Sequence, residues 1–140
     1  MSFPTPLESR VRWVAAAAVL VAAAAHLPVI AAHLQEAPYM GVLFIVLSSA
    51  CIVLGATLIS TDPPIVYRLA VTTCGLAMVG YVLTRVIAFP QLADDVGNWF
   101  EPLGIVSVVA ETVVVACGLA ALRVSGSPRS LATGSPTTAP

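Results

Sequence analysis

The 140-residue sequence contains no lysine and few charged side chains of any kind. Charged residues make up 9% of the chain, against about a quarter in an ordinary soluble domain. Such a chain has too little polar surface to cover a water-soluble globule, which indicates that its main solvent is lipid. It also has no basic patch for a nucleic acid, so nucleic-acid binding is excluded.

Cysteines and catalytic motifs are equally sparse. Cys51, Cys74 and Cys117 fall singly in separate apolar runs, where a lone cysteine usually acts as a small apolar side chain. The odd number of cysteines argues against a disulfide framework. The sequence shows no nucleophile with its base, no phosphate-binding glycine loop, and neither the C-x-x-C nor the H-x-x-x-H spacing of metal sites. We therefore expect a protein that is not an enzyme, with no cofactor and no metal.

Long apolar runs are what the sequence does contain. Four of them, at about 11–34, 40–59, 65–89 and 99–122, reach the roughly 20 residues that a helix needs to cross a bilayer. Short proline-containing connections make neighbouring runs antiparallel. The sequence thus predicts an all-α integral membrane protein, an up-down four-helix bundle at 11–123. It is flanked by an N-terminal segment at 1–10 and a disordered tail at 124–140.

Arginine placement predicts the orientation of the bundle. With four crossings, five of the six arginines fall on one side: Arg10, Arg12, Arg68, Arg123 and Arg129. The positive-inside rule then places both termini in the cytoplasm and the protein in the cytoplasmic membrane. An alternative is a signal peptide cleaved after the alanines at 22–24, which would leave three spans. The apolar stretch continues to Leu34, however, which favours a retained first span.

Polar residues interrupt these runs at helical spacing. In the first run, the stretch HLPVIAAH places His26 and His33 one heptad apart, with Pro28 between them. Interior stripes are predicted on the other three runs: Gly41, Ser48 and Gly55; Cys74, Met78, Tyr81 and Arg85; Gly104, Ser107, Glu111 and Gly118. Small residues allow close helix approach, and ionisable residues at bilayer depth usually face the interior and pair.

Counting residues inward from the outer ends of the spans gathers seven polar residues in the outer half of the bundle. This candidate cluster contains His26, His33, Glu36, Tyr81, Arg85, Glu101 and Glu111. We expect Arg85 to pair with Glu101 or Glu111, and His26 to reach Glu111. The neighbouring Asp94–Asp95 pair is interpreted as part of a solvated loop.

The cluster has several possible roles. The favoured hypothesis is structural, with an Arg–Glu pair and hydrogen bonds that fix helix register. Alternatives are a ligand or metal site at the outer mouth, a haem ligand, and a proton or small-molecule path through His26 and Glu111. A shared metal ion is disfavoured because His26 and His33 lie about 10 Å apart along the helix axis. Bis-histidine haem ligation would need a histidine on a second helix, and the sequence has no other histidine.

Three stretches, EAPYMGVLF, YVLTRVIAFP and WFEPLGIVSVVAE, resemble those of small four-span membrane proteins of the actinobacterial type. The resemblance covers roughly residues 20–120. It implies the four-helix topology and marks His33, Glu36, Arg85, Glu101 and Glu111 as positions of interest, but it implies no activity. We therefore expect a non-enzymatic membrane protein whose partners are the bilayer and other membrane subunits, as in an accessory subunit. The alternative is a membrane-embedded binding protein.

Overall fold

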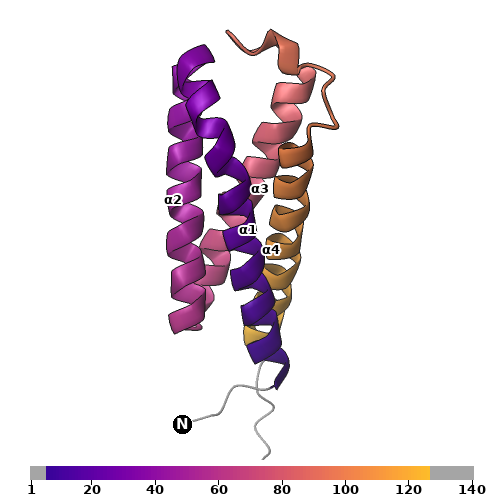
Figure 1. Cartoon of the computed structure of the whole chain (residues 1–140). Coiled ribbons are helices and arrows are strands. Elements are labelled where there is room, and N and C mark those ends of the chain that lie inside the picture. The colour runs from indigo at the N-terminus through magenta and orange to yellow at the C-terminus, as the bar shows by residue number, and fades with distance from the viewer. Residues whose placement is uncertain (1–5, 127–140) are drawn as a thin grey trace, which may run out of the picture.

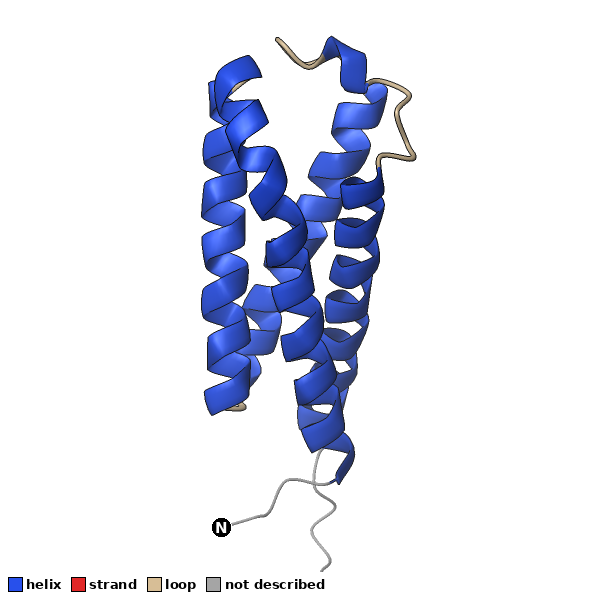
Figure 2. Cartoon of the chain, in the orientation of Figure 1, coloured by secondary structure: helices blue, strands red, loops and turns tan. Residues whose placement is uncertain are grey.

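The computed structural model describes residues 6–126, and every regular element in this range is helical (Figures 1 and 2). The order is α1 (Pro6–Glu36), α2 (Pro38–Ser60), α3 (Pro64–Val86), the short 3₁₀ helix η1 (Ala93–Asp95) and α4 (Pro102–Gly126). Each of the four α-helices is long and apolar enough to cross a membrane, which fits a multi-pass membrane protein. The predicted all-α class with four long helices is confirmed. The predictions for residues 1–5 and 127–140 lie outside the described residues.

Prolines set several helix ends, and they move the predicted boundaries by a few residues. Helices α2, α3 and α4 each begin with proline, which suits the first helical position because its missing N–H would have no partner there. The third helix ends at Val86 instead of 89, since Pro90 disfavours helical backbone in the residue before it. The fourth begins at Pro102 instead of 99, so residues 87–101 form a longer loop than expected.

The helices form two pairs that separate toward one end. Helix α1 packs against both α2 and α4, and α3 packs against α4, whereas the contact between α2 and α3 is much smaller. In Figure 1 the start of α1 and the end of α4 lie together at the lower end, and the α1–α2 and α3–α4 pairs diverge toward the upper end. The chain stays helical through Pro28.

The lower part of the molecule holds a continuous core, and we call residues 10–25, 51–74 and 112–124 the packed half. Its largest fully buried apolar side chains include Val19, Leu58 and Val114. Glycines allow the close approach, because a Cβ at Gly55 would lie 2.7 Å from Leu20 Cδ2 and one at Gly118 would lie 2.5 Å from Val71 Cγ2. The predicted stripes on α2 and α4 are buried as expected at these positions.

The upper part, residues 26–50 and 75–111, has no comparable core, and we call it the open half. Between residues 27 and 36 of α1 and between residues 75 and 84 of α3, no residue is fully buried. The buried positions that remain in the open half include polar and charged residues, namely His26, Ser48, Arg85, Ser107 and Glu111. The open half therefore concentrates polar groups where the packed half has an apolar core.

Candidate functional site: a cavity in the open half

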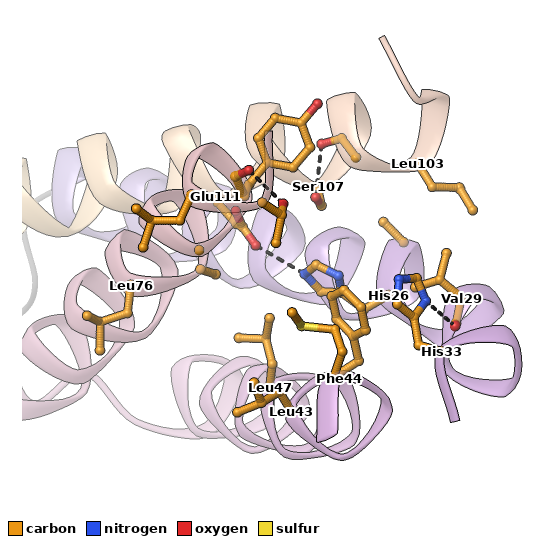
Figure 3. Close-up of a pocket in the computed structure, with 18 of the residues that line it drawn as sticks. His26, Val29, His33, Leu43, Phe44, Leu47, Leu76, Leu103, Ser107 and Glu111 are labelled. Carbon is orange, nitrogen blue, oxygen red and sulfur yellow. Dashed lines mark hydrogen bonds and ion pairs between the residues drawn. The ribbon is translucent and has the colours of Figure 1, made fainter. Parts of the chain in front are cut away.

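A cavity of about 800 Å³ lies between the four helices of the open half. Its volume falls within the roughly 300–1,000 Å³ of typical ligand sites. Most of its lining is apolar, with Leu43 and Phe44 from α2, Leu76 from α3 and Leu103 from α4 (Figure 3). Leu43 and Leu76 are 56% and 66% exposed, so the cavity opens to the outside between α2 and α3.

The floor of the cavity is a hydrogen-bonded side-chain pair between α1 and α4. His26 Nε2 lies 3.1 Å from Glu111 Oε1, and Figure 3 shows the two side chains pointing toward one another. His26 is 7% exposed and Glu111 is 1% exposed. A buried carboxylate needs such a partner, since an unpaired buried charge is strongly destabilising. The predicted contact between His26 and Glu111 is therefore confirmed.

The two histidines share a third ring, that of Phe44 on α2. His26 stacks on Phe44 with ring centroids 5.2 Å apart, and His33 meets the same ring edge-on at 4.9 Å. His33 Nδ1 lies 2.8 Å from the carbonyl oxygen of Val29. Because a carbonyl only accepts hydrogen bonds, this nitrogen carries the proton, and Nε2 of a neutral His33 keeps its lone pair. Both histidines thus face the bundle interior and the cavity.

The rim of the cavity is built around Arg85, which is 7% exposed. Its Nη1 lies 3.1 Å from Asp95 Oδ1, and its guanidinium carbon lies 4.6 Å from the centroid of the Tyr81 ring. The prediction that Arg85 turns into the bundle is confirmed. The predicted partners Glu101 and Glu111 are wrong, because Asp95 from the following loop supplies the counter-charge.

The loop at 87–101 reaches Arg85 because it folds back onto α3. The N–H of Gly97 donates to the carbonyl oxygen of Arg85 at 2.9 Å, and Gly97 has a φ of +80°, which glycine adopts without strain. Two tyrosines tie the loop down further, with Tyr39 donating to Pro90 O at 2.6 Å and Tyr81 to Trp99 O at 2.8 Å. Asp95 is therefore held in place and does not belong to a freely solvated loop.

Glu101 has a different role from the predicted one, as the cap of α4. Its carboxylate accepts the N–H groups of Leu103, at 3.1 Å, and of Gly104. The first N–H groups of a helix have no partner within it, and an acidic residue before the helix supplies one. The sequence carried this signal, since Glu101 directly precedes Pro102, a residue typical of the first helical position.

Six of the seven predicted residues line the cavity: His26, His33, Tyr81, Arg85, Glu101 and Glu111. Glu36 is exposed at the end of α1 and does not line it. The six do not form one network. They form a floor pair, an arginine rim and a helix cap, with His33 bound to its own helix. Among residues 6–126, no group of three histidine, cysteine or acidic side chains converges as metal ligands would.

Comparison with protein-family models, with curated proteins and with solved structures found no match to this chain.

Proposed function

We propose that this chain is a non-enzymatic multi-pass protein of the cytoplasmic membrane that binds a lipid-soluble ligand in the cavity of the open half. The observation that carries the proposal is the cavity itself. The open half has a cavity of about 800 Å³ where the packed half has an apolar core. Its lining is mostly apolar with a few convergent polar groups, which is the usual make-up of a ligand site.

An up-down bundle with both termini on the cytoplasmic side fits the distribution of charge. Arg12 and Arg68 lie in the second turns of α1 and α3, and Arg123 lies in the last turn of α4. These helix ends belong to the packed half. The loop at 87–101 belongs to the open half and carries acidic side chains. A reporter fused after Arg123 should be active in the cytoplasm, and one inserted at 94–95 should report the outside. A cytoplasmic signal from the second position would contradict this orientation.

The opening between α2 and α3 supplies an entry route from the bilayer. Leu43 and Leu76 border it and would face lipid tails in a membrane. Because lipid tails are as apolar as leucine, the hydrophobic effect does not drive a chain from the bilayer into the cavity. The apolar lining therefore provides shape, and the polar floor and rim provide selectivity.

Two glycines of α3 offer a matched test. A Cβ added at Gly80, which lines the cavity, or at Gly75, which does not, would meet nothing within 4 Å. We would photolabel membranes containing each variant with a hexadecanol probe that carries a mid-chain diazirine, and map the labelled peptides. Labelling near Leu47 and Leu76 should fall at least fivefold in Gly80→Leu and remain unchanged in Gly75→Leu. Equal labelling of the two variants would refute the binding site.

A role as an accessory subunit is the second candidate, because α2 and α3 leave an apolar flank that a helix of another protein could cover. The same experiment separates the two functions when a photoreactive amino acid replaces Leu76. A crosslink to a lipid supports ligand binding where Gly80→Leu abolishes it, since Leu76 is 66% exposed and also meets bulk lipid. A crosslink to one discrete membrane protein supports the accessory role instead.

A further inference from the structure

The guanidinium of Arg85 has an edge that its acidic partner does not use. An arginine side chain carries five N–H donors, and Asp95 engages Nη1 alone, through its carboxylate at 3.1 Å and its carbonyl oxygen at 3.5 Å. Nε is buried and has no hydrogen-bond partner among the described residues. Nη2 makes no hydrogen bond with the described residues either, and it is not enclosed as Nε is. Since Arg85 lines the cavity, Nη2 marks a place for an acceptor atom from outside the chain.

The charges around this edge decide what kind of acceptor fits. Asp95 already neutralises Arg85, and two further carboxylates, Glu101 and Glu111, line the same cavity. Among the described lining residues, the remaining basic groups are His26, which serves Glu111, and His33, which donates to its own helix. An anionic group would therefore meet an excess of negative charge, whereas a neutral carbonyl oxygen accepts from Arg85 without that penalty.

The position of Arg85 fixes the direction of the ligand. Arg85 lies at the mouth, and Leu76 lies nine residues deeper on the same helix, about 13 Å lower along the axis. A polar group at Arg85 therefore leaves an attached aliphatic chain to run down the apolar lining past Leu47 and Leu76 toward the His26–Glu111 floor. The Tyr81 ring, 4.6 Å from the guanidinium carbon, holds the guanidinium at the rim.

On the basis of the proposed function, we infer that the ligand is a neutral amphiphile whose carbonyl oxygen accepts a hydrogen bond from Arg85 Nη2 at the cavity mouth. The same chemistry occurs in a prenylated quinone and in the ester groups of a diacylglycerol. The inference assigns Arg85 as the residue that recognises the headgroup.

The test is a competition against the diazirine hexadecanol probe on full-length protein in dodecyl maltoside, a detergent without carbonyl groups. The competitors are a menaquinone, dioleoylglycerol, sodium oleate and the hydrocarbon squalene. A hydrogen bond to a charged group predicts that at least one neutral carbonyl compound displaces the probe at a roughly tenfold lower concentration than squalene does. The better of the two carbonyl competitors identifies the source of the headgroup.

Arg85→Lys removes the guanidinium and its unengaged Nη2 but keeps a positive charge for Asp95, and Arg68→Lys at the other end of α3 is the matched control. The carbonyl advantage should shrink to about twofold in Arg85→Lys and remain tenfold in Arg68→Lys. Displacement that is strongest with oleate would overturn the neutral headgroup. If all four competitors displaced the probe from the wild-type protein equally well, recognition by Arg85 would be refuted. This outcome does not depend on whether Arg85→Lys folds. In both cases the proposed function stands if Gly80→Leu still blocks labelling, and it falls if Gly80→Leu does not.

Discussion

The packed half and the open half are both built from apolar helices but differ in how their side chains pack. Leu58 in the packed half is fully buried, whereas Leu76 in the open half is 66% exposed. Glycine and alanine bring the backbones together in the packed half. In the open half Phe44 and Tyr81 stand between the helices instead. The length of the apolar runs therefore determines how many helices form, and the size of the side chains between the helices determines how closely the helices pack.

The largest expected effect is at the boundary between the halves. His26→Leu leaves Glu111 buried without a partner, and breaking a buried pair this way typically costs about 3 to 5 kcal/mol. Thermal unfolding in detergent, followed by labelling of the buried thiols of Cys51 and Cys74, would measure the loss. Glu111→Gln keeps a hydrogen-bonding group and should change stability by about 1 kcal/mol. Equal stability of His26→Leu and wild type would show that the His26–Glu111 pair does not stabilise the protein.

Truncating one leucine in each half sharpens the comparison. Leu58→Ala creates a void in a filled core and should cost about 2 to 5 kcal/mol. Leu76→Ala only enlarges a cavity that already exists, so its cost should stay within about 0.5 kcal/mol. The same unfolding assay tests both variants. Similar losses for the two would mean that the open half is packed in the membrane.

Two glycines should respond to alanine with opposite signs. At Gly118 the new Cβ would lie 2.5 Å from Val71 Cγ2, a stiff β-branched side chain, and should destabilise the protein by about 1 to 3 kcal/mol. At Gly80 the new Cβ meets nothing, so the higher helix propensity of alanine should stabilise by up to about 1 kcal/mol. A loss of stability in Gly80→Ala would show that another group occupies this space.

The smallest effect concerns the hydrogen bond across the mouth. Tyr39→Phe removes the donor to Pro90 O and should cost about 0.5 to 1.5 kcal/mol, toward the lower end because the site is exposed. Hydrogen exchange should speed up in residues 87–101 and remain unchanged in the packed half. Unchanged exchange in the loop would show that Tyr39 does not restrain it.

Much of the fold could be predicted because hydropathy and helical spacing are local properties. The length of the apolar runs predicted four helices, and the interior stripes predicted that His26 would lie opposite Glu111. The contact of Asp95 with Arg85 could not be predicted in this way, since it depends on a loop that turns back at Gly97. Spacing of apolar residues also does not distinguish a stripe that faces another helix from one that faces a void, so the cavity itself required the structure.

The hydrogen bond from Tyr39 to Pro90 has a mechanical consequence. It joins α2 to the loop that follows α3, at the tips of two helix pairs whose bases are fixed in the packed half. The two helix pairs are therefore joined firmly in the packed half, and among the described side chains the Tyr39 hydroxyl links them by a hydrogen bond at the opposite end. A change in the angle between the α1–α2 and α3–α4 pairs would alter the width of the cavity mouth and leave the His26–Glu111 pair in place. Under the proposed function, the cavity would therefore accept ligands of different widths and select mainly by the groups that reach the floor and the rim.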